Sequence, residues 1–520
     1  MLTDESLEFA RQHIFWFYDT DFYPKPFEFK ALWHSWEEVK QYLISTPIQQ
    51  LQTTNPKVLP WLKAKGGYRV VHQLEPLDAL IYTALVYICA ADIEQARMVP
   101  SVACSYRISP TDSSFFAHGS GFPLYRNSCE LLSSRHNYVL STDISDFYNQ
   151  IYLHRIANSI EAVSTFPKIG STIENFLMRL NNKASQGIPV GPAASVVLAE
   201  AILIDIDQFI ANNHVEHVRY VDDIRIFSDS QEELEEILER LVIYLHDQHR
   251  LSLSGEKTSI RTTDEFLHEE LQNQYQLEKL EILNDIEAGN PYEIYEEPED
   301  ADALDDAEDN TSEDNLSQTL LDALVRAKNF GYVDLAVLRA IIRRAKSQKI
   351  PDLAELILTD IAFFRPVIND VALYLDSLPS AALLKLKALF SSLCSDRKLE
   401  SLSTRVWMEW LLTRHPDLLQ EQAIRKYVYS GNTIAASSAA IIQKNQAWAK
   451  QAKQNLLSLA SWNRRASIYS LSALSNDEKN KFISHIMQNP TMTATDKWVC
   501  KWVKDGCPEL DFVDLDDIFG

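Results

Sequence analysis

The chain has 520 residues, 46% of them hydrophobic, and a formal net charge of -24 at pH 7. This length leaves room for two or three domains, and the apolar content is sufficient for complete hydrophobic cores. The six cysteines are scattered without a CxxC pair, which argues against a zinc site or a disulfide framework. Residues 1–5 (MLTDE) lack the basic and apolar regions of a signal peptide, and we find no apolar run of membrane-spanning length. We therefore expect a cytoplasmic protein without a membrane partner.

One short segment carries a large share of the negative charge. Residues 285–314 contain fourteen acidic residues and no Lys or Arg, whereas residues 317–520 contain 26 Lys and Arg against 21 Asp and Glu. A segment with the composition of residues 285–316 cannot bury enough surface to order itself, so we expect a flexible acidic linker there. The net charge does not exclude a nucleic-acid partner, because binding requires only a locally basic channel.

Residues 1–115 are expected to be helical and rich in aromatic side chains. Residues 63–69 (KAKGGYR) form a basic turn that Gly66 and Gly67 make mobile. The apolar residues 77–96 (LDALIYTALVYICAADIEQA) predict a buried helix. The N-terminal part of the chain is therefore predicted to combine buried helices with one exposed basic hairpin.

Residues further along carry carboxylates at the ends of predicted strands. The apolar start of residues 138–143 predicts a buried strand that ends at Asp143. Two strand-like runs, residues 216–220 and 224–227, place Asp222 and Asp223 at a hairpin tip. Adjacent carboxylates are costly unless a cation lies between them, and two Mg²⁺ ions would take their oxygens together with substrate phosphates. The pattern predicts a site for two Mg²⁺ ions, with Mn²⁺ as the alternative ion.

Between these acidic sites, residues 185–195 (SQGIPVGPAAS) form a turn rich in Gly and Pro, followed by a helix at residues 196–210. Glycines in such a turn let the backbone approach a base pair or a sugar closely. Each segment also has an ordinary structural explanation, with Asp143 as a helix N-cap, the turn as a loop and the acidic pair as a solvated tip. The occurrence of all three segments in this order favours a catalytic explanation.

From residue 317 onward the sequence predicts helix after helix without a strand. Apolar residues recur at three-to-four spacing in five segments: 321–345, 352–364, 381–393, 402–413 and 435–459. Units of this size predict stacked helical pairs, an α-solenoid. A basic cluster in the first segment either lines a nucleic-acid path or forms a solvated helix face; it comprises Arg339, Arg343, Arg344, Lys346 and Lys349.

As a set, the central motifs resemble those of the reverse transcriptases. Asp143 with Tyr148 looks like the first palm motif of that family, and residues 185–195 look like its second motif, which contains a QG pair. Residues 220–223 (YVDD) look like its YxDD motif.

Three further segments extend the resemblance, which spans residues 59–260. Residues 63–69 are similar to the fingers hairpin that holds the incoming triphosphate, and residues 251–258 (LSLSGEKT) to the segment whose lysine lies near the leaving pyrophosphate. Residues 105–107 (SYR) are similar to the SYxFR-like stretch of retron and group II intron enzymes.

The resemblance implies an α+β fold of the right-hand polymerase type, with an antiparallel sheet covered by helices. We expect the N-terminal helices and fingers at residues 1–115 and the palm at residues 116–284. The acidic linker would follow at residues 285–316, and an all-α, HEAT-like helical-repeat domain at residues 317–520.

The resemblance also implies a role for each matching residue. Asp143, Asp222 and Asp223 would be catalytic and would hold the two metal ions together with Ile144. Lys257 would be catalytic as a proton donor to pyrophosphate, with an exposed surface lysine as the alternative. The implied nucleotide-binding residues are Lys65, Arg69, Tyr148, Gln186 and Gly187.

Two of these nucleotide contacts have a clear physical basis. Arg69 offers a bidentate fork that phosphate oxygens accept. The bulk of Tyr148 beneath the ribose would exclude a 2′-hydroxyl and favour DNA synthesis, and its alternative role is that of a core tyrosine.

A palm without an evident thumb, followed by a long helical region, resembles the abortive-infection and defence-associated reverse transcriptases of bacteria. This resemblance implies antiphage function, dNTP substrates, cyclic homo-oligomers, and DNA that is made without a template and attached to the protein. Two alternatives stay open, namely an enzyme that copies a dedicated non-coding RNA and a catalytically silent RNA-binding or assembly module. Three clustered carboxylates that repel one another without metal argue against the silent palm.

Overall fold

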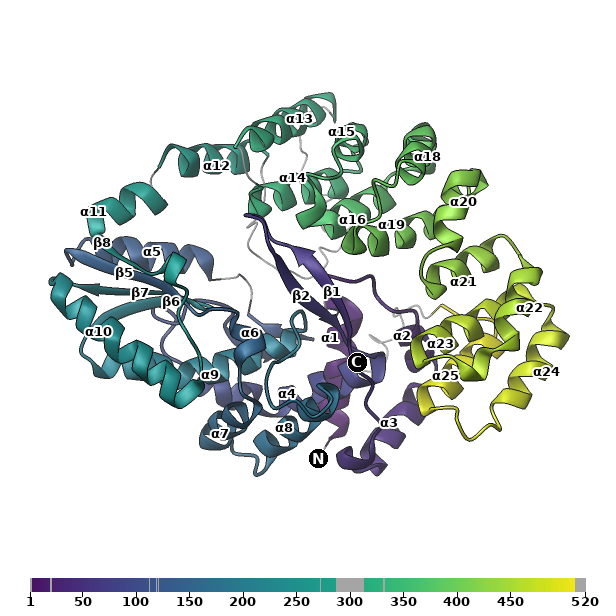
Figure 1. The fold of residues 1–520 in the computed structure, drawn as a ribbon, viewed down its shortest axis with the longest axis horizontal. Coiled ribbons are helices and arrows are strands. Elements are labelled where there is room, and N and C mark those ends of the chain that lie inside the picture. Colours follow the sequence, from purple (N-terminus) through teal and green to yellow (C-terminus); the bar gives the residue numbers. More distant parts are fainter. Residues whose placement is uncertain are drawn as a thin grey trace, which may run out of the picture. The chain divides into compact units, whose positions relative to one another are not determined.

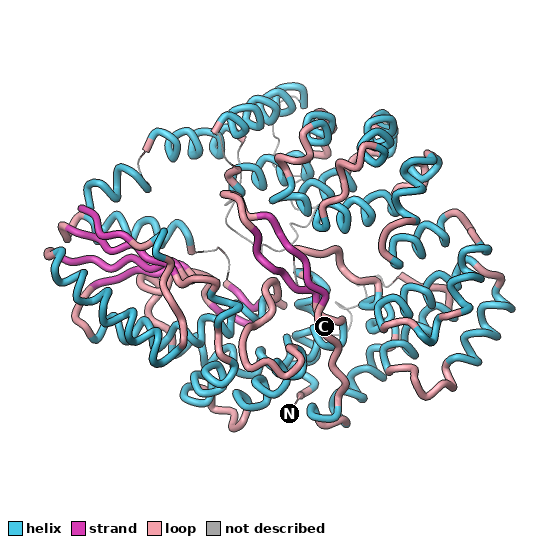
Figure 2. The backbone as a smooth tube through the Cα atoms, viewed as in Figure 1, coloured by secondary structure: helices cyan, strands magenta, loops and turns pink. Residues whose placement is uncertain are grey.

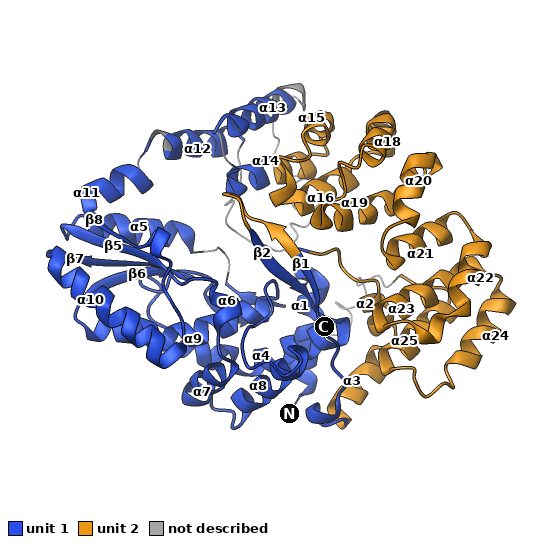
Figure 3. Cartoon of the chain, in the orientation of Figure 1, with its two compact units in different colours: residues 1–22, 46–59, 68–341 blue, residues 23–45, 60–67, 342–520 orange. Residues whose placement is uncertain are grey.

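The computed structural model describes residues 2–18, 21–111, 113–117, 119, 121–271, 273–286, 313–330 and 333–509 (Figure 1). The chain forms two compact units, both discontinuous in sequence: residues 1–22, 46–59 and 68–341 make unit 1, and residues 23–45, 60–67 and 342–520 make unit 2 (Figure 3). Most of the predicted acidic linker, residues 287–312, lies outside the described residues.

A four-stranded antiparallel sheet with the order β6-β7-β5-β8 is the main sheet of unit 1 (Figure 2). Its strands are β5 (Tyr138–Asp143), β6 (Glu216–Tyr220), β7 (Asp223–Ser228) and β8 (Ser259–Thr262). The observed strands confirm the predicted buried strand and the predicted hairpin. The predicted palm therefore contains the antiparallel sheet that its motifs require.

Two long apolar helices, α4 (Pro76–Ala96) and α9 (Ala193–Asn212), pack against each other in unit 1. α4 begins at a strong start signal, because the Glu75 side chain accepts the backbone N–H of Leu77 at 2.9 Å and Pro76 follows as the first helical residue. Most residues of both helices are buried, as expected for helices that are apolar around most of their circumference. Both predicted helices are thus confirmed.

The expectation that no segment reaches membrane-spanning length was wrong for α4, which by length and composition could cross a membrane. In the protein, 78% of the most apolar window of α4 is buried. Its apolar residues therefore belong to the core of unit 1.

Further elements cover this core and carry the predicted basic hairpin. The other helices near the sheet and core of unit 1 include α1 (Asp4–Phe17), α5 (Phe122–Ser133), α7 (Leu153–Val163), α8 (Ile169–Leu180) and α10 (Gln231–Tyr244). β1 (Lys57–Leu62) and β2 (Tyr68–Gln73) form a separate two-stranded sheet, and β3 (Ile108–Thr111) pairs with β4 (Ser114–Phe116). The turn between β1 and β2 is the basic hairpin, and it is grouped with unit 2.

The C-terminal region is rich in helices, as predicted. Its longer helices are α13 (Glu313–Asn329), α14 (Leu335–Ser347), α15 (Leu353–Thr359), α16 (Ile368–Ser377), α18 (Lys387–Ser395), α19 (Leu402–Arg414), α20 (Gln422–Tyr429), α21 (Thr433–Ile442), α22 (Gln446–Gln454), α23 (Ser461–Ser470), α24 (Asn476–Ile486) and α25 (Ala494–Lys504). The short α17 (Ser380–Lys385) precedes α18. The arrangement of these helices as a HEAT-like solenoid stays a prediction.

Several predicted C-terminal helices were wrong in extent, because each is two shorter helices or ends early. The predicted helix at residues 435–459 is α21 followed by α22. Between them Lys444 adopts a left-handed φ of 49°, and the Asn445 side chain caps α22 by accepting the Trp448 N–H at 3.1 Å. Apolar periodicity continues across such a break when both helices bury a face in one core, so periodicity alone cannot locate it.

The other interruptions follow the same pattern. The predicted helix at residues 321–345 is divided into α13 and α14, that at 381–393 into α17 and α18, and that at 352–364 ends with α15. Only the predicted helix at residues 402–413 is observed as one element, α19.

Unit 2 also includes an N-terminal segment. Helices α2 (Glu28–His34) and α3 (Trp36–Ser45) belong to it, and α2 packs against α25. Glu28 and Arg465 form a buried ion pair, with Oε1 and Nε 3.1 Å apart, although they are 437 positions apart in sequence. The C-terminal helices therefore have part of their core supplied by the start of the chain.

Candidate active site

The three predicted catalytic carboxylates lie at one end of the four-stranded sheet. Asp143 is the last residue of β5 and is in register with Asp223, the first residue of β7. Asp222 lies in the turn between β6 and β7, and its carbonyl oxygen accepts the backbone N–H of Ile144 at 3.3 Å. Residues 79 positions apart in sequence are thus brought together by strand pairing. We call Asp143, Asp222 and Asp223 the carboxylate cluster.

Lys257 joins this cluster from the short helical turn before β8. Its Nζ lies 2.9 Å from Oδ2 of Asp143. Partial burial lowers the pKa of Lys257, but its hydrogen bond to Asp143 and the charges of Asp223 and Asp222 outweigh burial and raise the pKa. Lys257 is therefore an exposed surface lysine, with 58% of its side chain accessible, that also forms an ion pair with Asp143.

The carboxylate cluster holds more negative charge than its neighbours neutralise. Burial, followed by the charges of Asp143 and Asp223, raises the pKa of Asp222 to about 7. Burial and Asp143 also raise the pKa of Asp223, although Arg225 lowers it from 3.9 Å away. The Asp223 side chain keeps 44% of its exposure, so solvent screens part of this effect. The cluster favours an additional positive charge.

The donor chemistry of the cluster fits magnesium, since carboxylate oxygens are its preferred protein ligands. Ile144 is fully buried and can offer a metal only its backbone carbonyl oxygen. Across the described residues, no three His, Cys, Asp or Glu side chains are already arranged around one ion position. Asp143 would have to exchange its contact with Lys257 for a metal contact.

The second predicted motif lies against the segment that carries Tyr148. The Gly187 N–H donates to the Ile151 carbonyl at 2.8 Å, and the Ile188 N–H donates to the Tyr148 carbonyl at 3.0 Å. Gly187 has a φ of 88°, which is accessible to glycine without strain. These backbone contacts bring Tyr148 and Gly187 together.

Gln186 contributes a side-chain contact at the same place. Its Nε2 donates to Oε1 of Gln150 at 2.6 Å. Tyr148 is half-buried and makes an edge contact with Phe147 at a centroid distance of 5.8 Å. The ring is half-buried and therefore not a fully buried core tyrosine, and its role at the sugar stays a prediction.

The two basic residues of the predicted fingers hairpin differ in position. Arg69 lies on β2 in unit 1 and is exposed; desolvation by the surrounding residues lowers its pKa, and the negative charge of Asp222 opposes this shift. Arg339 on α14 also lowers the pKa of Arg69. Lys65 is exposed in the β1–β2 turn, which belongs to unit 2. Within unit 1, Arg69 is thus close enough to the carboxylate cluster to interact with it electrostatically.

β2 is tied directly to the second motif. The backbone N–H of His72 donates to the Val190 carbonyl at 2.9 Å, and the Val190 N–H donates to Nδ1 of His72 at 3.0 Å. Val190 stands three positions after Gly187, so these two bonds connect the strand of Arg69 with the loop beside Tyr148.

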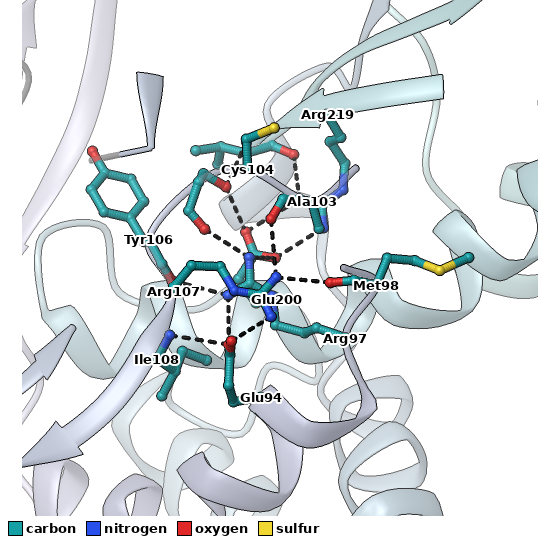
Figure 4. A network of polar contacts seen from close by, with 12 residues as sticks. Glu94, Arg97, Met98, Ala103, Cys104, Tyr106, Arg107, Ile108, Glu200 and Arg219 are labelled. Atoms are coloured by element: carbon teal, nitrogen blue, oxygen red, sulfur yellow. Dashed lines mark hydrogen bonds and ion pairs between the residues drawn. The ribbon is translucent and has the colours of Figure 1, made fainter. Parts of the chain in front are cut away.

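Sequence reasoning missed a network of polar contacts in unit 1, part of which is shown from close by in Figure 4. We call it the buried ionic network; it comprises Glu94, Arg97, Ser105, Arg107, Glu200, Asp207 and Arg219. Arg219 is fully buried and contacts two carboxylates of α9: its Nη2 lies 2.9 Å from Glu200 and 2.7 Å from Asp207. The network therefore connects β6 with α9.

Arg97 joins the network from the end of α4. Its guanidinium donates to the Ser105 carbonyl at 2.7 Å and lies 2.9 Å from Glu200. Arg107 donates to the Ala103 carbonyl at 3.1 Å and pairs with Glu94. Residues 105–107 (SYR) are thus held against the end of α4 by hydrogen bonds and ion pairs of Arg97 and Arg107.

The network neutralises its own charges. Burial alone would raise the pKa of Asp207, but Arg219 and His217 outweigh it and lower the pKa to about 2. The pKa of Glu200 is also lowered, because Arg219 and Arg97 overcome burial. A signal was present in the sequence, since Arg219 interrupts a short strand and the two acids, seven positions apart, lie on one face of an apolar helix.

A comparison with protein families identifies the domain that contains the carboxylate cluster. Residues 62–283 match the family model described as reverse transcriptase (RNA-dependent DNA polymerase). The chain contains a reverse-transcriptase domain. It is accordingly a nucleotidyltransferase of the RNA-directed DNA polymerase class, as the motifs predicted, and enzymes of this class bind nucleic acids and dNTPs.

Solved structures and curated proteins add little to this assignment. The chain is similar to a telomerase from Candida albicans in complex with a TWJ fragment of telomeric RNA, with 13% identity, a TM-score of 0.30, and coverage of 74% of this chain and 70% of that chain. It is also similar to apo telomerase from Candida tropicalis, with 9% identity, a TM-score of 0.32, and coverage of 76% and 77%. Scores this low support no conclusion about what this reverse-transcriptase domain copies. No curated protein matches the chain in sequence.

Proposed function

We propose that the chain polymerises deoxynucleotides with two Mg²⁺ ions bound by Asp143, Asp222 and Asp223, and that Mn²⁺ can replace them. The observation that carries this proposal is the convergence of the three carboxylates with Lys257 at one end of the sheet. When bound, such ions activate a priming hydroxyl and neutralise the phosphates of the reacting nucleotide. The backbone carbonyl of Ile144 completes the proposed ligand set.

The protein groups around the cluster have distinct proposed tasks. Lys257, once released from Asp143, stabilises or protonates the leaving pyrophosphate. Arg69 and Lys65 bind the triphosphate, and the interaction of Arg69 with the charge of Asp222 supports its part in this task.

The segment of Tyr148 and the second motif beside it are proposed to contact the sugar of the nucleotide. Tyr148 excludes the 2′-hydroxyl, while Gln186 and Gly187 fix the backbone on which it stands. The hydrogen bonds between the second motif and residues 148–151 support this arrangement.

We further propose that this polymerase acts in antiphage defence as a cytoplasmic, cyclic homo-oligomer. The support is architectural, since a palm with no evident thumb is followed by a long helical region, and this region has an excess of Lys and Arg. In this proposal DNA grows without a template from a protein side chain and stays attached to it.

The second candidate is templated copying of a dedicated non-coding RNA. It is favoured by the basic residue Arg339, which lies in electrostatic reach of Arg69 and would extend a positively charged path for a phosphate backbone. A silent RNA-binding palm is the third candidate, and the unneutralised carboxylate cluster argues against it.

One experiment separates these candidates. The purified full-length protein is incubated with Mg²⁺ and labelled dNTPs, with and without nuclease treatment, and its products are resolved before and after proteinase digestion. Labelled DNA that requires proteinase for release supports protein priming, and labelling that RNase abolishes supports a bound RNA template. No incorporation in any arm would contradict the polymerase proposal and leave the RNA-binding module.

A further inference from the structure

Val221, the residue between Tyr220 and Asp222, has an unusual backbone conformation. Its φ is 54°, in the left-handed region that a β-branched side chain rarely occupies. Such a conformation persists only where the surrounding structure imposes it. The residues that impose this conformation on Val221 therefore also influence the position of Asp222, which follows it.

The buried ionic network satisfies both backbone polar groups of Val221. Its N–H donates to Oγ of Ser105 at 3.0 Å, and its carbonyl accepts from Nη1 of Arg219 at 2.9 Å. Arg219 lies only two positions before Val221, but Ser105 lies 116 positions away, so the contact with Ser105 cannot be a local turn preference. The left-handed conformation is held from outside the turn.

Glu200 connects these two partners to each other. Its Oε1 accepts from Oγ of Ser105 at 3.1 Å and from Nη1 of Arg219 at 3.2 Å, and Asp207 holds the opposite side of the guanidinium. Glu200 and Asp207 both lie on α9, which belongs to the core of unit 1. Through Ser105, Arg219 and these two acids, the turn is therefore connected to the buried helix α9.

Aromatic packing around Tyr220 also holds the turn. The Tyr220 ring contacts Tyr106, Phe122 and Tyr125 at centroid distances of 6.1, 5.5 and 5.6 Å. Immediately after Val221, the Asp222 carbonyl accepts the Ile144 N–H. A shift at Val221 would therefore change the spacing between Asp222 and Asp143.

We propose that Ser105, Glu200 and Arg219 are positioning residues for the metal-binding carboxylates. They hold Val221 in its left-handed conformation, and through it they set the separation of Asp222 from Asp143 without touching substrate. This inference rests on the proposed polymerase function and deepens it, because it assigns the geometry of the metal site to a buried network on α9.

The test compares two buried serines of unit 1 in the full-length protein. Ser105→Ala removes the oxygen that accepts the Val221 N–H. Ser133→Ala makes the same chemical change at a buried hydroxyl without a hydrogen-bond partner among the described residues. For Ser105→Ala we expect kcat to fall about 10- to 100-fold and the Mg²⁺ concentration for half-maximal rate to rise about tenfold. The dNTP KM should change little, and Ser133→Ala should resemble the wild type in all three measurements.

Amide hydrogen exchange supplies a readout independent of activity. The peptide that contains Val221 should exchange faster in Ser105→Ala than in the wild type, since its N–H has lost its acceptor, and Ser133→Ala should leave this rate unchanged. If Ser105→Ala loses only thermal stability, while its kcat per folded molecule, its Mg²⁺ midpoint and the Val221 exchange rate match the wild type, the positioning role is wrong.

A second variant tests the same link from the side of Val221. Asn tolerates the left-handed region better than Val, so Val221→Asn should need the network less. Ser105→Ala should therefore reduce kcat by a smaller factor in the Val221→Asn background than in the wild type. Equal factors in both backgrounds would overturn the proposal.

These outcomes are distinguishable from failure of the proposed function. If the wild type shows neither dNTP incorporation nor a Mg²⁺-induced rise in Tm, the polymerase proposal itself fails. If the wild type shows both and Ser105→Ala behaves like Ser133→Ala, only the positioning inference fails.

Discussion

The buried ionic network and the carboxylate cluster are made of the same kinds of charged side chain, in adjacent parts of unit 1, yet their electrostatic surroundings are opposite. In the network, three arginines face three carboxylates, and the pKa of Asp207 falls to about 2. In the cluster, three carboxylates face mainly Lys257 and Arg225, and the pKa of Asp222 rises to about 7. The charges of the network balance one another, whereas the carboxylate cluster favours an additional cation.

This difference separates a structural use of charge from a catalytic one. A buried carboxylate stabilises a fold only when its partner and hydrogen bonds offset the cost of its dehydration. A carboxylate meant to bind an ion must keep part of its charge unpaired until the ion arrives. The direction of the pKa shift therefore distinguishes the two roles within one domain.

Removing a carboxylate from the cluster should have the largest effect. Asp222→Ala should lower dNTP incorporation by about 10³-fold, the scale of losing a group that stabilises the transition state. The Tm measured in EDTA should stay equal or rise, because one of three repelling charges is gone. Incorporation is measured with Mg²⁺ and a saturating dNTP concentration.

The matched control is Asp247→Ala, which removes an exposed aspartate from the same unit. It should leave both rate and Tm unchanged. Mg²⁺ should raise the Tm of the wild type and of Asp247→Ala but not of Asp222→Ala, and full incorporation by Asp222→Ala would contradict the catalytic role of the cluster.

Removing a carboxylate from the network should instead destabilise the fold. Asp207→Asn leaves the buried Arg219 guanidinium with Glu200 as its remaining carboxylate partner, so the loss should be at most the roughly 3–5 kcal/mol of a fully broken buried pair. Urea unfolding, followed by tryptophan fluorescence, should show this loss in the free energy of unfolding. The control Glu236→Gln breaks the exposed pair with Arg240 and should cost less than about 0.5 kcal/mol. Equal losses in the two variants would erase the distinction between buried and exposed charge.

Much of the cluster could be predicted from the sequence because its signals are local. A YxDD tetrapeptide between two alternating runs specifies a hairpin tip, and a short apolar run that ends in Asp143 specifies a strand end. Only the pairing of these strands is non-local, and the order of the motifs within one known family supplied it. The observed register between Asp143 and Asp223 is the result.

The network could not be predicted in the same way, because each of its members is ambiguous alone. Arg219 within a strand and Glu200 within an apolar helix are unusual, because charged side chains are rarely buried unless they are paired. The sequence around each residue does not indicate which residue is its partner. The partners come from α4, α9, β6 and residues 105–107, and only the tertiary fold brings them together. The same limit hid the pairing of Glu28 with Arg465 in unit 2.

His13 is a buried titratable group that forms no ion pair with any described acidic residue, and it extends the comparison. His13 of α1 is fully buried, and burial lowers its pKa to about 4 although its Nδ1 lies 2.9 Å from the Ser113 carbonyl. Because the folded pKa lies below the unfolded value of 6.5, the stability that neutral His13 contributes is present above pH 6.5. It is lost as the pH falls toward 4, by up to about 3 kcal/mol.

Variants can separate this loss from that of the network. The free energy of unfolding of His13→Phe should vary less than that of the wild type between pH 6.5 and 4. The contribution of Asp207, whose pKa is depressed from 3.8, should be lost only as the pH falls from about 4 toward 2. Urea melts at half-unit pH intervals give both profiles. A His13→Phe profile parallel to that of the wild type between pH 6.5 and 4 would show that His13 is not the titrating group.

The smallest expected effect concerns Tyr148, which stands five positions after Asp143 and is held by the backbone of the second motif. Tyr148→Ala opens space at the proposed sugar site, so the ratio of ribonucleotide to deoxyribonucleotide incorporation should rise about tenfold, equivalent to about 1.4 kcal/mol. Tyr148→Phe keeps the ring and should keep the wild-type ratio. Both ratios are measured as kcat/KM for matched rNTP and dNTP pairs. A ratio unchanged in Tyr148→Ala would mean that the ring only packs against Phe147, and it would leave the carboxylate cluster and the network unaffected, because neither depends on which sugar is selected.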